Sequence, residues 1–99
     1  MKIIAKNEQE TLALQVIGRL DTLTSNQLEA EMKKIDNGVK TLVLDFTELE
    51  YITSVGIRIL ISANKMMTRQ GGKLILHGLN EEVSEVLEIT GVLELFCVE

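Results

Sequence analysis

The sequence lacks, or nearly lacks, several residue types on which common functions depend. It has no proline, one cysteine and one histidine, and aromatic residues make up 3% of its 99 residues. A single cysteine cannot form an internal disulfide, and one cysteine with one histidine is too few ligands to suggest a metal cluster. No apolar run approaches the ~20 residues of a membrane span, and the N-terminus has no signal-peptide pattern. We therefore expect a cytoplasmic protein that needs no metal, no cofactor and no membrane.

The net charge and the length of the chain further restrict the kinds of partner and domain organisation that are expected. The net charge is −5 and the isoelectric point is near 4.9, so a direct nucleic-acid partner is not expected. Hydrophobic residues make up 45% of the chain and charged residues 25%, as is usual for a folded domain. With so few aromatic residues, the core must consist mainly of Leu, Ile, Val and Met. The length suits one domain, residues 1–99.

Hydrophobic periodicity predicts an α/β fold. Short apolar runs predict strands at residues 2–6, 11–17, 39–45, 73–77 and 95–98. Helical spacing predicts helices at about 24–37, 54–69 and 80–90. The first two strands are expected to form a hairpin, and the later strand–helix–strand order favours a parallel crossover. The run at 39–45 shows little alternation, so both faces of that strand are expected to be buried.

The first helix has the start signals of a capped helix. Thr24 followed by Gln27 is typical of a capping box, and Leu23 and Leu28 have the spacing of a hydrophobic staple. Asp21 lies just before them and can accept bonds from backbone or hydroxyl groups. Two interpretations of Asp21 stay open, because it can stabilise the turn or take part in a functional site.

Two hydroxyl residues precede the second helix. Thr53 or Ser54 can cap its N-terminus, and a phosphate is also favoured there by free N–H groups and the helix dipole. Ile57 and Ile61 fall outside the core stripe of this helix, near Arg58. Either a neighbouring loop covers them, or they form a small docking stripe for a partner.

The patterns that catalysis requires are missing. Gly71-Gly72 lacks the lysine and hydroxyl residue of a phosphate-binding loop and follows a helix instead of opening one. His77 ends a strand without an accompanying nucleophile or carboxylate pattern, which favours a structural histidine. We therefore expect a binding protein and not an enzyme.

Three stretches of the chain resemble the signature of the STAS domain, the fold of bacterial anti-sigma factor antagonists. They are Asp45-Phe46-Thr47 with the segment from Tyr51 to Leu60, the turn Gly18-Arg19-Leu20-Asp21, and Val83 to Val92 with Leu95-Phe96. They cover nearly the whole chain in the right order. The resemblance implies one α/β STAS-like domain with a mixed central sheet of about five strands and helices packed mainly on one face.

The resemblance also implies a function. The chain would be an anti-sigma factor antagonist acting by partner switching, and its partners would be an anti-sigma factor with serine kinase activity and a phosphatase. In that family the phosphorylated residue most often stands directly before the glycine. Val55 holds that position here, so Ser54 is the expected phosphoacceptor and Thr53 the second choice. The expected partner-binding residues are Asp21, Thr53, Ser54, Val55, Ile57, Arg58 and Ile61.

Val55 at this position also favours an alternative. The domain can be a scaffold subunit that binds its complex without being phosphorylated.

Overall fold

The strands form one mixed sheet, and the computed structural model describes all residues, 1–99. The strands are β1 (Lys2–Glu8), β2 (Thr11–Leu20), β3 (Thr41–Asp45), β4 (Leu49–Ile52), β5 (Lys73–His77) and β6 (Cys97–Val98). The helices are α1 (Ser25–Met32), α2 (Ser54–Arg69), α3 (Glu81–Ile89) and the short 3₁₀ helix η1 (Leu93–Leu95). No helix is both long and apolar enough to reach across a bilayer.

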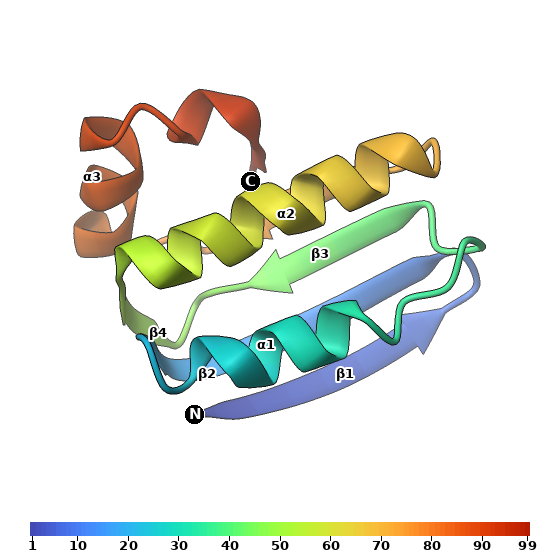
Figure 1. Ribbon diagram of the computed structural model, residues 1–99, viewed down its shortest axis with the longest axis horizontal. Coiled ribbons are helices and arrows are strands. Elements are labelled where there is room, and N and C mark those ends of the chain that lie inside the picture. The colour runs from blue at the N-terminus through green and yellow to red at the C-terminus, as the bar shows by residue number, and fades with distance from the viewer.

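The sheet has the order β1-β2-β3-β5-β6, and β4 pairs with the far end of β2. β1 and β2 form the predicted antiparallel hairpin, and all other pairs are parallel. Figure 1 shows α1 and α2 side by side in front of the sheet, with α3 at the end where β4 lies. The predicted α/β architecture with a mixed sheet is confirmed, with six strands in place of about five.

The core lies between the sheet and the α1–α2 layer. It is built almost wholly from Leu, Ile, Val and Met, with Phe46 and Phe96 as its aromatic members. In β3, Leu42 and Leu44 are fully buried, whereas Val43 on the opposite face is only half-buried. The expectation that both faces of this strand are buried is therefore wrong. The helices cover the face that carries Leu42 and Leu44, and Val43 on the other face keeps partial exposure.

The strand β4 was not predicted, because residues 47–50 have the composition of a turn. β2 is longer than its apolar run and continues past the end of β3, so its free backbone groups bind β4 instead. Leu20 pairs with Ile52 there, after a bulge between Gly18 and Arg19. Leu49 and Ile52 are buried, which fixes this short strand against the core.

The start of α1 differs from its sequence prediction. The Thr24 hydroxyl accepts a bond from the backbone N–H of Asp21 at 3.0 Å, and the N–H of Gln27 bonds the backbone carbonyl of Thr24 instead. Leu23 is 82% exposed and does not pack on Leu28. The capping box and the hydrophobic staple are both wrong, because the loop's own hydrogen bonds hold the chain there.

The observed ends of the helices can be compared with those predicted from capping residues and glycines. α1 stops at Met32, before Asn37-Gly38, because the next bonds from Lys34 and Ile35 span three residues and tighten the chain. The predicted bounds of α2 are confirmed. The predicted cap of α3 is also confirmed, since the side chain of Asn80 accepts a bond from the N–H of Val83 at 2.7 Å.

Candidate functional site

The candidate site is the corner where β4 ends and α2 begins. Thr53 donates two bonds to the carbonyl of Leu20, from its backbone N–H at 2.9 Å and from its hydroxyl at 3.2 Å. Its half-buried side chain therefore ties the corner to β2. Ser54 follows directly, is exposed, and makes no side-chain hydrogen bond. Of the two predicted hydroxyls, only that of Ser54 is free and accessible.

The N-terminus of α2 has no side-chain cap. Thr53 stands at the N-cap position with extended backbone, but its hydroxyl is directed to β2 and bonds no N–H of the helix. The expectation that a hydroxyl caps this helix is therefore wrong. The first N–H groups of an uncapped helix lack partners and carry a partial positive charge. This corner consequently offers an anion a favourable place beside Ser54.

A glycine allows α2 to approach the sheet closely. A Cβ atom on Gly56 would lie 2.8 Å from Cγ1 of Ile52, 3.0 Å from Cβ of Leu20 and 3.2 Å from the Leu20 carbonyl oxygen. Both neighbours are buried. The start of α2 therefore packs directly on the ends of β2 and β4, which gives the corner a fixed position.

Asp21 lies in the turn that follows β2. Because Leu20 pairs with Ile52, Asp21 and Thr53 follow adjacent residues of neighbouring strands. The Asp21 carboxylate accepts bonds from the N–H and the hydroxyl of Thr24, both at 3.0 Å, and from the N–H of Leu23 at 3.1 Å. The bonds from Thr24 lower the pKa of this carboxyl, with smaller help from the Leu23 N–H and from Arg19. The turn-stabilising interpretation is confirmed, and the turn lies beside the corner.

The two isoleucines of α2 do not form an exposed stripe. Ile57 is 7% exposed and belongs to the core, and Ile61 is half-buried against it. The predicted docking stripe is wrong, and the alternative, coverage by a neighbouring segment, is confirmed. The C-terminal segment returns from α3 and contacts α2 further along the helix (Figure 1). The side chain of Asn64 donates to the carbonyl of Leu95 at 3.3 Å across this contact.

The sequence of almost the whole chain matches one protein family. The sequence model described as "STAS domain" matches residues 2–99. The chain belongs to the STAS domain family. A protein of Bordetella bronchiseptica that carries the name anti-sigma factor antagonist BtrV is 38% identical over 82 residues, which cover 82% of this chain and 71% of that protein.

Solved structures show the same fold. An anti-sigma factor antagonist from Mycobacterium paratuberculosis superposes with a TM-score of 0.86 at 19% identity, covering 98% of this chain and 83% of that one. The Bacillus cell fate determinant SpoIIAA in its phosphorylated form gives a TM-score of 0.77 at 18% identity, covering 99% and 91%. Its unphosphorylated form gives 0.82 at 18%, covering 99% and 88%. At such identities these likenesses establish the fold.

Two residues beside the corner of this STAS domain were missed in the sequence. The guanidinium of Arg19 lies 5.5 Å from the ring centre of Tyr51, and the two residues are paired across β2 and β4. The nearby Tyr51 raises the pKa of Arg19, with a smaller contribution from the charge of Glu50. Their contact depends on β4, which was itself not predicted. The aromatic and β-branched pair Tyr51-Ile52 was the available signal, because such residues favour strands.

The rest of the STAS domain shows no catalytic arrangement. The Asp45 carboxylate accepts bonds from the N–H of Thr47 at 3.0 Å and from its hydroxyl at 2.7 Å, which explains the Asp-Phe-Thr motif as a turn. Burial raises the pKa of Asp45, but the bonds from Thr47 and the nearby His77 hold it below its ordinary value. His77 pairs with Asp45 across the strands, and no group of three metal-ligating side chains exists.

Proposed function

We propose that this STAS domain is an anti-sigma factor antagonist that acts by partner switching and is controlled by phosphorylation of Ser54. The observation that carries the proposal is the free, exposed hydroxyl of Ser54 at the uncapped start of α2. The relatives support the regulatory role, since they are named anti-sigma factor antagonists. The structures of SpoIIAA in phosphorylated and unphosphorylated form support the modification.

The partner supplies the chemistry in this proposal. An anti-sigma factor with serine kinase activity binds the unmodified corner and brings ATP and Mg²⁺. The STAS domain contributes the acceptor hydroxyl and no catalytic group, so it is a binding protein and not an enzyme. A phosphatase restores the free hydroxyl. Because sigma factors act on transcription, the domain works in the cytoplasm.

A phosphate on Ser54 would change the surface without unfolding the domain. It adds about −1.5 to −2 charges and three acceptor oxygens at the positive end of α2. Arg58 is exposed one helical turn further on, at the i,i+4 spacing that suits an ion pair. Phosphate on Thr53 would instead break the hydroxyl bond to Leu20 and displace a half-buried side chain. Ser54 is therefore the better acceptor, and Asp21, Val55 and Arg58 surround it as partner contacts.

Mass spectrometry after incubation with the cognate kinase and ATP tests the acceptor. Ser54→Ala should abolish phosphate uptake, whereas Thr53→Val should still be modified. Equal uptake by Ser54→Ala and the unaltered protein would overturn the assignment.

Calorimetric titration with the anti-sigma factor tests the switch. Ser54→Asp should bind at least about tenfold more weakly, which corresponds to ~1.4 kcal/mol. Asn7→Asp is the matched control, because it adds the same charge on exposed β1, at the opposite end of the sheet.

The scaffold role remains the second candidate, and Val55 favours it. This side chain holds the family's usual acceptor position and is half-buried. A tight complex whose affinity is the same for Ser54→Asp and the unaltered protein would select this function.

A further inference from the structure

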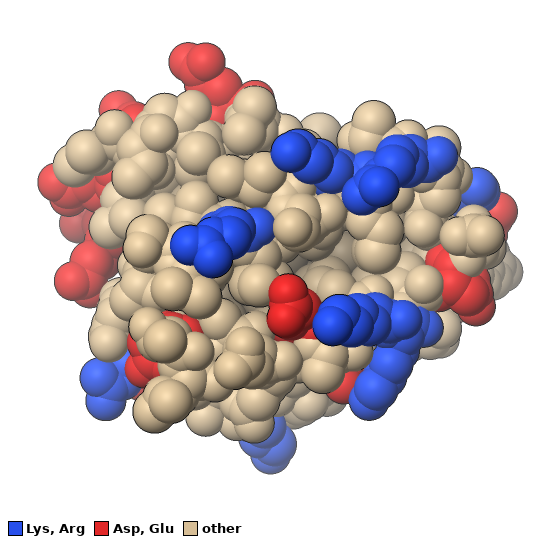
Figure 2. Space-filling view, in the orientation of Figure 1, with Lys and Arg blue, Asp and Glu red and all other residues tan.

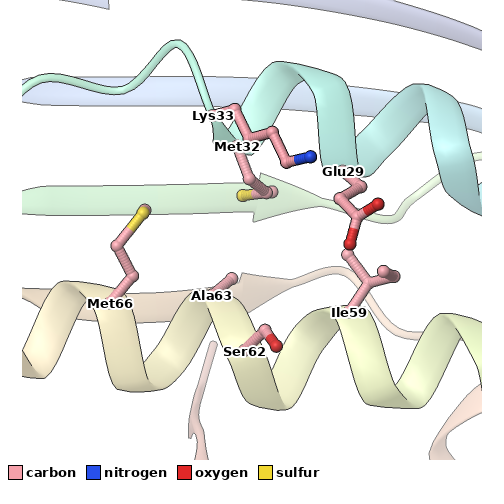
Figure 3. A pocket seen from close by; sticks show the side chains of 7 residues that line it. All are labelled: Glu29, Met32, Lys33, Ile59, Ser62, Ala63 and Met66. Atoms are coloured by element: carbon pink, nitrogen blue, oxygen red, sulfur yellow. The ribbon is translucent and has the colours of Figure 1, made fainter.

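An apolar cleft opens between α1 and α2 at the front of the molecule. Its volume is about 170 Å³, and Ile59, Ala63 and the two methionines Met32 and Met66 provide its apolar lining. Figure 3 shows Met32 of α1 and Met66 of α2 directed into the gap between the helices. A closed apolar cavity of about 150 Å³ is large enough for benzene. This cleft therefore has room for one aliphatic side chain, and methionine adapts readily to such a guest.

The charged residues of α2, which forms one wall of the cleft, are all basic, although the chain as a whole is acidic. α2 carries Arg58, Lys65 and Arg69 and no acidic residue. Lys33, which directly follows α1, lines the cleft together with the acidic Glu29. In Figure 2 the charged atoms over α2 are blue, and the acidic atoms gather at the end of the molecule where α3 lies. An occupant that fits this cleft should place carboxylates around an apolar side chain.

The C-terminal part of the same chain has this chemistry. Residues 81–99 include six glutamates and no lysine or arginine. Ile89, at the end of α3, is 76% exposed. Glu85 lies one turn before it on the same face of the helix, and Glu88 is its direct neighbour. An uncovered isoleucine beside carboxylates is complementary to a methionine-lined cleft that has Lys33 in its lining and the basic residues of α2 next to it.

We propose that α3 of one molecule docks into the α1–α2 cleft of a second copy. Ile89 fills the cleft, and Glu85 and Glu88 face Lys33 and Arg69. The two surfaces lie on different parts of the molecule (Figure 1), so one copy cannot satisfy its own cleft. The contact is head-to-tail, and it generates chains or rings instead of an isolated twofold dimer.

The net charge does not prevent this contact at physiological salt. The Debye length there is about 8 Å, so contact pairs within the interface keep their attraction. The shortest extent of the molecule is 20 Å, which keeps the centres of two docked copies well beyond that length. Repulsion between their net charges is therefore largely screened.

Two variants separate the two halves of the interface. The double variant Lys33→Glu with Arg69→Glu alters the cleft side, and the single variant Ile89→Asp alters the α3 side. All three residues are exposed, so both variants should fold, and circular dichroism checks this. In sedimentation equilibrium at about 0.15 M salt, the average mass of the unaltered protein should rise with concentration. Each variant should raise the dissociation constant about tenfold or more. An equimolar mixture of the two should associate again but stop at a dimer, since each supplies the half that the other lacks.

Each control variant carries the same type of substitution as a test variant, at exposed positions outside the proposed interface. Lys2→Glu with Lys73→Glu reverses two exposed lysines away from the cleft, and Leu23→Asp alters another apolar residue that is 82% exposed. Both should associate like the unaltered protein. The proposal is overturned if the unaltered protein stays monomeric up to about 1 mM. It is also overturned if Ile89→Asp associates normally, or if the mixture does not regain association.

Discussion

Replacing Gly56 by alanine should destabilise the domain, although alanine is the better helix former. The new methyl group would meet Ile52 at 2.8 Å and Leu20 at 3.0 Å, and the Leu20 carbonyl oxygen at 3.2 Å. Neither side chain can turn away into solvent, because Ile52 is 4% exposed and Leu20 is 0% exposed. Overpacking of this kind costs about 1–3 kcal/mol, and three simultaneous contacts favour the upper part of that range. The gain in helix propensity offsets about 1 kcal/mol.

The expected net loss is therefore about 1–2 kcal/mol, or roughly 4–16 °C in Tm for a domain of this size. Urea denaturation and thermal melting followed by circular dichroism measure it. A double-mutant cycle with Ile52→Ala should show coupling, because removing Cγ1 removes the closest contact. A Gly56→Ala protein as stable as the unaltered one would refute the close packing of α2 on β2.

Three further predictions concern single polar side chains. Ser25→Ala should leave the free energy of unfolding unchanged or raise it by about 1 kcal/mol, because the Ser25 hydroxyl is buried without a partner; a clear loss in urea denaturation would contradict this. Asn80→Ala should lower the free energy of unfolding by more than the ~0.5–2 kcal/mol of a lost cap, because it also removes the bond that the Asn80 amide donates to the carbonyl of Leu49 at 2.8 Å; Asn80→Asp keeps the acceptor for Val83 but loses that donor, so urea denaturation should show a loss for it too. The lowered pKa of Asp21 means that its stabilising effect is present above the ordinary aspartate value of about 3.9 and lost as the pH falls through the lower folded value. The urea midpoint should therefore depend less on pH below 5 in Asp21→Asn than in the unaltered protein.

The sequence predicted well those elements whose ends are set by nearby residues. The end of α2 follows from the glycines after it, and the Asn80 cap of α3 acts over three residues. The fold class followed from the order of such elements and from the family resemblance. The position of Ser54 at the start of α2 was predicted in the same way, but the expected hydroxyl cap of this helix is absent.

Features that depend on distant segments were missed. β4 exists because β2 continues beyond β3, and Ile57 and Ile61 are covered because α2 packs them against the core. Thr53 does not cap α2, because Leu20, far away in sequence, takes its hydroxyl bond. Periodicity describes each segment alone and cannot show these partners.

The length of β2 determines how the corner can respond to modification. This strand pairs with β1 and β3 along its first part and with β4 at its end, so one backbone ladder joins the centre of the sheet to the corner. Opening the corner would require breaking the bonds between β4 and the end of β2, where Leu20 and Ile52 are buried. Amide protons of β4 should therefore exchange with solvent on the timescale of global unfolding, not of local fraying. A signal at Ser54 would then be read by partners from a rigid surface, with no need for an order–disorder transition.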